Sequence, residues 1–169
     1  MSILSPEAVT RLWDEHRSVL VLYARQWCDA PEDVVQETFL LLVRQVVAPE
    51  NPVGWLYRVV RHRAMNAARS RGRQSRRENA AAARGEPWFE PAEGDRLDAV
   101  AATDALKHLP IEQREVIVAR VWGGLAFEEI ARLSEMSLSK VYRSYQRGLA
   151  VLRERLDVSC SGKKSKAKS

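Results

Sequence analysis

Hydrophobic residues recur at helical spacing through most of the chain, so the sequence predicts an all-α fold. A first helix is expected from Ser5, the N-cap, with Pro6 at the first helical position, to about residue 28. A second is expected from Pro31 to about residue 47, and a third begins at Asn51–Pro52. The predicted inward-facing residues of these three helices are Val9, Leu12, Trp13, His16, Leu20, Tyr23 and Trp27, then Val35, Phe39, Leu42 and Val46, then Trp55, Leu56, Val59, Val60 and Ala64.

A second group of three helices is predicted within residues 109–156. Pro110 suits the start of the first, Gly123–Gly124 ends it, and a short helix follows near residues 127–133. Ser137 is a favourable N-cap for a longer last helix. The expected inward residues are Ile111, Val116, Ile117 and Val121, then Phe127, Ile130, Ala131 and Leu133, then Leu138, Val141, Tyr145, Leu149, Leu152 and Leu156. A short helix, a tight turn and a longer helix predict a helix-turn-helix.

The last helix carries a set of polar and cationic side chains at i, i+1, i+4, i+5 and i+8. In a helix-turn-helix the second helix lies in the DNA major groove, where such groups contact base edges and phosphates. The predicted outward residues are Ser139, Lys140, Arg143, Ser144 and Arg147. An ordinary three-helix bundle with a basic, solvated face remains the alternative at this point.

The third helix has an extreme charge pattern. Residues 55–77 contain no acidic residue and eight arginines, although the whole chain has a net charge of only +5. Like charges at this density repel one another and are usually neutralised by a polyanion. The eight residues are Arg58, Arg61, Arg63, Arg69, Arg71, Arg73, Arg76 and Arg77. The pattern therefore favours nucleic-acid binding over a merely solvated face.

The composition also indicates how the chain is divided. We expect two small helical domains, residues 1–78 and 95–158, joined by a flexible linker at 79–94. The lysine-rich residues 159–169 are expected to be disordered.

Several kinds of protein are not indicated by the sequence. The two cysteines and three histidines (Cys28, Cys160, His16, His62 and His108) match no metal, redox or catalytic spacing, and no glycine-rich phosphate loop occurs. No apolar run approaches a membrane span, and nothing resembles a signal peptide. We therefore expect a cytoplasmic protein with no enzymatic activity, metal, cofactor or membrane insertion.

Three segments taken together resemble bacterial RNA polymerase sigma factors of the sigma-70 family. They are APEDVVQETFLLLVRQV, NPVGWLYRVVRHRAMNAARSRGR and, after the linker, LPIEQREVIVARVWGGLAFEEIARLSEMSLSKVYRSYQRG. The closest group is the two-domain extracytoplasmic-function class. The resemblance is specific because two motif blocks occur in the family's order and separation.

The resemblance implies a role for each block. Region 2, residues 1–78, would bind core RNA polymerase and recognise and melt the minus-ten element of promoter DNA. Region 4, residues 95–158, would read the minus-thirty-five element with its helix-turn-helix. The implied core-binding residues are Asp33, Gln36 and Glu37; the minus-ten residues are Arg58, Arg61, His62, Asn66, Arg69 and Arg73; the minus-thirty-five residues are Ser139, Lys140, Arg143, Ser144 and Arg147. An anti-sigma factor is a further partner expected for the family.

Some residues depart from the family pattern. His62 and Asn66 stand where the family usually has Asn and Asp, and Glu135 replaces the usual glycine of the turn. Because these changes affect residues that would contact the promoter, we assign this chain no promoter consensus sequence from the family. The competing hypothesis is a stand-alone helix-turn-helix regulator, which would bind specific DNA without polymerase.

Overall fold

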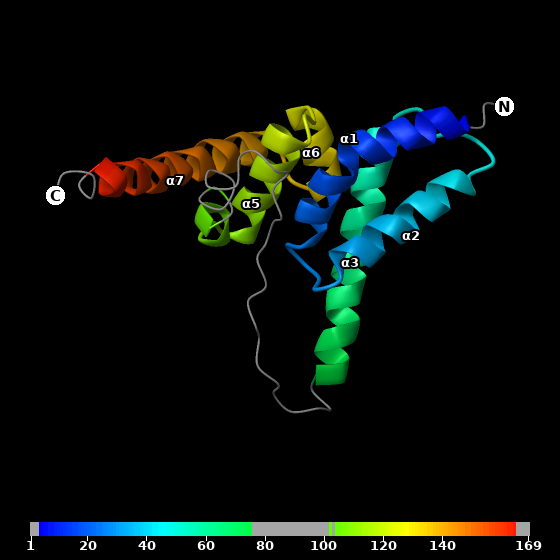
Figure 1. Cartoon of the computed structure of the whole chain (residues 1–169), viewed down its shortest axis with the longest axis horizontal. Coiled ribbons are helices and arrows are strands. Elements are labelled where there is room, and N and C mark those ends of the chain that lie inside the picture. The colour runs from blue at the N-terminus through cyan, green and yellow to red at the C-terminus, as the bar shows by residue number, and fades with distance from the viewer. Residues whose placement is uncertain (1–3, 76–101, 103, 165–169) are drawn as a thin grey trace.

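The computed structural model of the protein describes residues 4–75, 102 and 104–164, and all regular secondary structure in these residues is helical. The helices are α1 (Pro6–Ala24), α2 (Pro31–Val43), α3 (Pro52–Ser75), α5 (Ile111–Ile117), α6 (Phe127–Ser134) and α7 (Leu138–Lys164), with a π-helical turn, η1 (Val118–Trp122), directly after α5. The predicted linker at 79–94 lies outside the described residues. Figure 1 shows α1–α3 on one side and α5–α7 on the other.

Helices α1, α2 and α3 pack against one another as the first domain. Their starts agree with the sequence prediction. The Ser5 hydroxyl accepts a hydrogen bond from the Ala8 amide at 3.2 Å, and the Asn51 side chain accepts one from the Gly54 amide at 2.9 Å. These caps satisfy amides that have no partner within the helix. Trp13 of α1 meets Phe39 of α2 edge to face, with ring centroids 4.9 Å apart.

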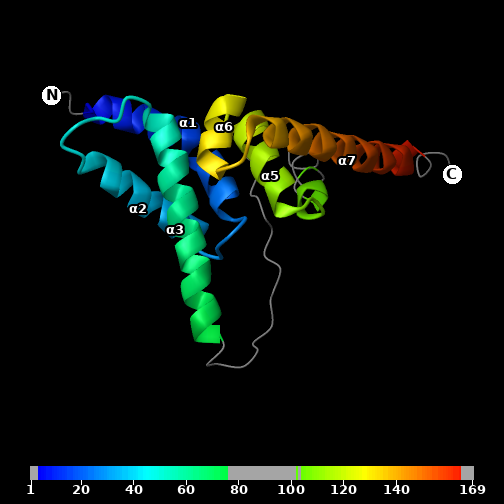
Figure 2. The same cartoon turned by 180° about the vertical axis from the view of Figure 1, so that it is seen from behind.

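The second domain contains the predicted helix-turn-helix, α6 and α7, supported by α5. Ser137 caps α7 by accepting a hydrogen bond from the Lys140 amide at 3.3 Å. The turn between α6 and α7 contains Glu135 in the left-handed conformation, with φ 58° and ψ 29°. Helix α7 extends away from the first domain (Figure 2).

Some expected positions differ in the structure. Helix α2 ends at Val43, so Val46 lies in the following loop and is 69% exposed instead of inward. Val121 is 50% exposed because the wider π-helical turn changes the helical phase after α5. Ile111, the first residue of α5, is also substantially exposed. Helix α7 continues to Lys164, past residue 159 where disorder was expected to begin.

The two domains pack directly on each other, and their buried residues form one continuous hydrophobic cluster. Helix α1 contacts η1, and α3 contacts α6. Tyr57 of α3 is fully buried beside Gly123, where a Cβ atom would overlap the Tyr57 hydroxyl and lie 2.6 Å from the Ala119 carbonyl oxygen. Gly123 is therefore required by the close approach of the two domains.

We predict that Gly123→Ala lowers the stability of the full chain by about 1–3 kcal/mol, the usual cost of overpacking a filled interior. Thermal and urea unfolding would measure this. Adding Tyr57→Phe removes the hydroxyl that the new methyl group meets, so the double variant should recover part of the loss. Equal losses with and without Tyr57→Phe would contradict this origin of the effect.

Candidate nucleic-acid interface

The arginine-rich face of α3 lines a groove of about 620 Å³. Its long wall includes five of the predicted minus-ten residues, Arg58, Arg61, His62, Asn66 and Arg69. The groove is also lined by Leu133 and Glu135, which belong to the second domain. Arg73 lies in α3, but its side chain is outside the described residues. The groove thus gathers cationic and amide side chains that can bind phosphates and base edges.

The five residues differ in their solvent exposure. Arg58, His62, Asn66 and Arg69 are exposed, and the His62 ring lies 3.3 Å from the Asn66 amide nitrogen one helical turn away. The Arg61 side chain, in contrast, is only 20% exposed. In this conformation Arg61 is held between the domains, which the helical pattern did not reveal.

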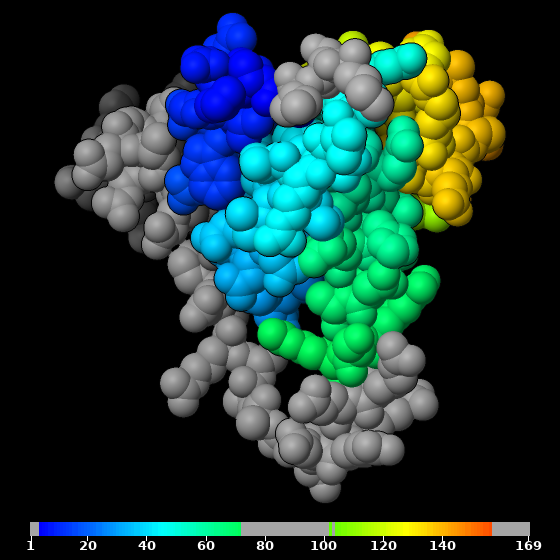
Figure 3. Space-filling view, turned by 90° about the vertical axis from the view of Figure 1, so that its right-hand side faces the viewer, coloured from blue at the N-terminus to red at the C-terminus, as the bar shows by residue number. Residues whose placement is uncertain are grey.

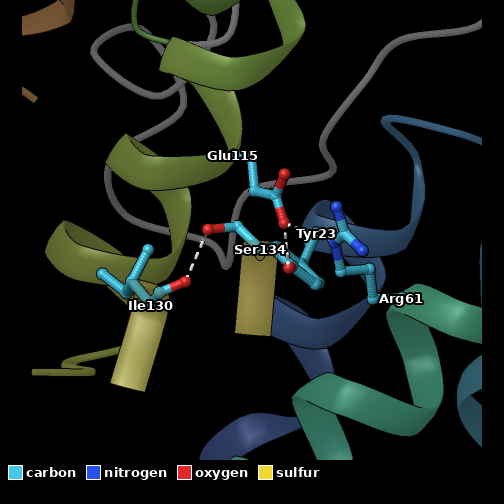
Figure 4. A network of polar contacts seen from close by, with 5 residues as sticks. All are labelled: Tyr23, Arg61, Glu115, Ile130 and Ser134. Carbon is cyan, nitrogen blue, oxygen red and sulfur yellow. Dashed lines mark hydrogen bonds and ion pairs between the residues drawn. The ribbon is translucent and has the colours of Figure 1, made fainter. Parts of the chain in front are cut away.

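Arg61 belongs to a polar cluster at the domain interface (Figure 4). Its Nε donates to Glu115 Oε1 at 2.7 Å, and the Tyr23 hydroxyl donates to the same oxygen, also at 2.7 Å. The Arg61 guanidinium also lies over the Trp27 ring, 5.8 Å from its centroid. Glu115 is on α5 of the second domain and its side chain is 5% exposed, while both of its hydrogen-bond donors, Tyr23 and Arg61, belong to the first domain.

These contacts change the titration of the groups involved. Burial raises the pKa of Tyr23 well above its usual value, and the charge of Glu115 raises it further. Desolvation tends to lower the pKa of Arg61, but the hydrogen bond and charge of Glu115 outweigh it and raise the pKa. Burial also raises the pKa of Tyr57. The cluster is therefore most stable with a neutral Tyr23 and a charged Arg61.

The predicted core-binding residues form an exposed acidic and amide face on α2. Helix α2 lies beside α3 on the surface of the molecule (Figure 3). Asp33, Gln36 and Glu37 are all exposed, and their i, i+3, i+4 spacing places them on one side of the helix. Glu37 forms an ion pair with Arg63 of α3. The same side continues into Leu40 and Val43, which are 56% and 58% exposed.

Sequence reasoning did not select Leu40 and Val43 as functional residues. The available signal was the helical spacing: Leu40 follows Glu37 by three residues and Val43 follows Leu40 by three, so both continue the same side of the helix. Exposed apolar residues that continue a polar functional face are typical of protein-binding surfaces.

The predicted DNA-reading face of α7 is largely exposed. Ser139, Arg143 and Arg147 face solvent, and the Lys140 amine forms a 2.7 Å ion pair with Glu112 of α5. Ser144, which was also predicted to face outward, is only 7% exposed. The prediction was wrong for this side chain because it lies on the same side of α7 as the buried residues 141 and 148.

Two exposed side chains of α7 were missed. Tyr142 is 44% exposed and packs against Phe127 of α6, with ring centroids 4.3 Å apart. Gln146 is exposed one turn later. Both lie between the cationic positions of the helix, which is the signal that could have identified them.

Neither a metal-ligand group nor a membrane-spanning helix occurs in the described part of the chain. No group of three potential metal ligands occurs there. Among the same residues, no helix is both long enough and apolar enough to cross a bilayer.

Two family models match the chain. The model described as Sigma-70 region 2 matches residues 12–74, and the one described as Sigma-70, region 4 matches residues 99–152. Together they cover most of the chain in the order expected from the motifs. No curated protein sequence is similar enough to the chain to count as a match.

Solved structures of other proteins share the fold. The sigma factor RpoE from Bartonella quintana, solved in complex with the anti-sigma factor NepR, is 22% identical and has a TM-score of 0.69. The alignment covers 88% of this chain and 96% of that one. CnrH, solved in complex with the cytosolic domain of CnrY, is 24% identical with a TM-score of 0.60, covering 91% and 90% of the two chains.

We predict that alkaline pH weakens the interface through Tyr23. Because the folded-state pKa of this phenol lies above its unfolded value of about 10, its contribution to stability is complete below that pH and is lost as the pH rises above it. Melting temperatures measured from about pH 8 to 11 should fall less steeply for Tyr23→Phe than for the wild type. The control Tyr142→Phe, which alters an exposed phenol, should keep the wild-type slope; equal slopes in all three proteins would contradict the prediction.

Proposed function

Because the chain belongs to the sigma-70 family and has its regions 2 and 4, as in the extracytoplasmic-function group, we propose that it binds core RNA polymerase and directs it to specific promoters. The observation that carries this proposal is the arrangement on the first domain, where an exposed acidic face of α2 adjoins the arginine-rich face of α3. One small domain thus offers both a protein-binding and a nucleic-acid-binding surface. The family consists of transcription initiation factors rather than enzymes, and the polymerase supplies the chemistry.

Core polymerase would bind along α2. Asp33, Gln36 and Glu37 would provide charged and amide contacts, and Leu40 and Val43 would add apolar area at the end of the same face. Specific protein interfaces usually combine apolar area with polar groups beside it. The ion pair of Glu37 with Arg63 supports this role, because it holds the carboxylate in place on the surface.

The minus-ten element would bind in the α3 groove. Opening DNA there costs a few kcal/mol for each unstacked base, and phosphate contacts together with capture of a flipped base can offset this cost. Arg58, Arg61, His62 and Asn66 would face the DNA, and Arg69 and Arg73 would bind phosphates. The His62–Asn66 contact supports a polar surface with both donors and acceptors, which suits base edges.

The minus-thirty-five element would be read by α7 in the major groove. Ser139, Lys140, Arg143 and Arg147 would supply polar contacts, and Tyr142 and Gln146 would complete the exposed face. Ser144 is left out of this set because it is buried. The aromatic contact of Tyr142 with Phe127 supports a fixed orientation of its ring toward solvent.

The protein would act in the cytoplasm, where polymerase and promoters are found, and an anti-sigma factor would control it. The second point is supported by the two similar structures, since one contains the anti-sigma factor NepR and the other the cytosolic domain of CnrY. Both are complexes of a chain with this fold.

Core binding is tested first. We predict that the purified protein co-elutes with bacterial core RNA polymerase and that the double variant Asp33→Lys, Glu37→Lys does not, because it reverses both charges of the α2 face. The control Asp14→Lys, Glu15→Lys makes the same change at exposed positions of α1 and should still bind. Failure of the wild type to bind core, with specific duplex binding by the protein alone, would instead support a stand-alone regulator.

Upstream recognition is tested with two neighbouring substitutions. Arg143→Ala should weaken holoenzyme binding to a promoter mapped with the wild-type protein by about 1–3 kcal/mol, the value of one good base contact. Ser144→Ala should leave the affinity unchanged because this side chain is buried. Footprinting and affinity measurements on the same promoter would provide the comparison. If Ser144→Ala had the larger effect, the proposed reading face of α7 would be wrong.

A further inference from the structure

One aromatic side chain lies among the polar and charged groups of the proposed reading face of α7. Tyr142 is 44% exposed. Its exposed neighbours on that face are polar or cationic: Ser139, Arg143, Gln146 and Arg147. We propose that Tyr142 determines part of the promoter specificity, because its ring contacts the 5-methyl group of a thymine in the major groove of the upstream element. This inference rests on the proposed function for the identity of the DNA site and adds the base that Tyr142 selects.

The ring of Tyr142 is held by packing against the preceding helix. It lies against Phe127 of α6, with ring centroids 4.3 Å apart and the two planes tilted by 35°. Phe127 is fixed in turn, because Tyr145 meets it edge to face with centroids 5.1 Å apart and the Arg120 guanidinium lies over its ring, 4.5 Å from the centroid. Tyrosine also has few rotatable side-chain bonds, so little entropy is lost when its ring contacts a partner. Tyr142 therefore presents a preoriented apolar surface to solvent.

Tyr142 also lies in the part of α7 that reaches base edges. In a helix-turn-helix, residues near the start of the second helix contact the bases. Helix α7 begins at Leu138, so Tyr142 is at the start of its second turn. The ring is therefore within reach of the base edges when α7 lies in the major groove.

An apolar ring distinguishes thymine from the other bases by a simple chemical difference. In the major groove, thymine alone of the four bases presents a methyl group, and the other distinguishing groups at the base edges are hydrogen-bond donors and acceptors. Burying the methyl group against the ring is favourable. Placing the ring against a donor or an acceptor instead removes that group from water without giving it a partner, which is costly. The same side chain thus favours thymine and disfavours the other three bases.

The next residue in the chain places this thymine relative to a second base. Arginine most often contacts O6 and N7 of guanine in the major groove. Arg143 directly follows Tyr142 and is also exposed. Both side chains lie within one helical turn, which rises about 5.4 Å and corresponds to less than two base-pair steps of about 3.4 Å. The thymine contacted by Tyr142 therefore lies within about two base pairs of the base pair contacted by Arg143.

The test uses the full chain bound to bacterial core RNA polymerase. The wild-type holoenzyme first selects a promoter from duplexes that are randomised in the upstream element. Each thymine of the selected upstream element is then replaced, one at a time, by deoxyuridine, which removes only the 5-methyl group. Competition binding measures the affinity of the holoenzyme for each duplex. One replacement should weaken wild-type binding by about fourfold, the effect of removing one methyl group from an apolar contact.

The same duplexes are measured with three variants. Tyr142→Ala should bind the thymine and deoxyuridine duplexes equally, because the ring is gone. Tyr142→Phe should keep the about fourfold difference, since it removes only the hydroxyl. The matched control is Arg143→Ala, which should bind both duplexes more weakly but keep the difference between them. Such a cycle of protein and DNA substitutions isolates the contact between one ring and one methyl group.

The outcomes separate the thymine contact from the proposed function. If no thymine of the selected element is sensitive to the replacement, or if the sensitivity persists in Tyr142→Ala, the contact is wrong although the holoenzyme still binds the promoter. Loss of the sensitivity in Tyr142→Phe would assign the contact to the hydroxyl and would also overturn the proposal. If Tyr142→Ala is unfolded by circular dichroism, Tyr142→Gln takes its place, because it also removes the ring.

Failure of the wild type to bind core polymerase would overturn the proposed function. The same replacements would then be measured on the duplex that the protein selects by itself. Sensitivity to one methyl group that is lost in Tyr142→Ala would still support the contact. If the protein selected no duplex in either form, both the proposed function and the thymine contact would be wrong.

Discussion

The arrangement of the two domains depends on one carboxylate whose partners all belong to the other domain. Glu115 is 5% exposed, and its Oε1 accepts from both Tyr23 and Arg61. An ionised group cannot remain buried without such partners, so the carboxylate requires the first domain to stay packed against α5. Around it, Tyr23 lies 5.0 Å from the rings of both Trp27 and Tyr57, so the polar contact is enclosed by aromatic side chains.

Local backbone geometry makes this contact possible. The π-helical turn after α5 and the absence of a side chain at Gly123 let Tyr57 lie directly against the second domain. Its hydroxyl is buried and has no hydrogen-bond partner among the described residues, so packing rather than polar bonding holds this part of the interface. The interface thus combines one specific ion pair with a closely fitted apolar surface.

The helices and caps were predictable from sequence because their causes are local. Ser5, Asn51 and Ser137 each cap the helix that follows, as their positions indicated. The Glu115 contact was not predictable, because Tyr23 and Glu115 are 92 positions apart and their helical patterns alone do not show that the domains meet. Ser144 and Val121 were misplaced for related reasons: a helical pattern does not identify which small polar residue is buried, and a π-helical turn changes the phase without a sequence signal.

Glu135 shows how a departure from a family pattern can be understood once the domains are placed. A residue with a Cβ atom in the left-handed conformation costs of order 1 kcal/mol or more, and a glycine in the same turn would avoid this. The side chain nevertheless faces the arginine-lined groove of the other domain, where its charge stabilises that of Arg61. The strain is local to the second domain, whereas the electrostatic gain exists only while the two domains are together. A carboxylate at this position therefore adds an electrostatic attraction between the two domains that a glycine could not supply.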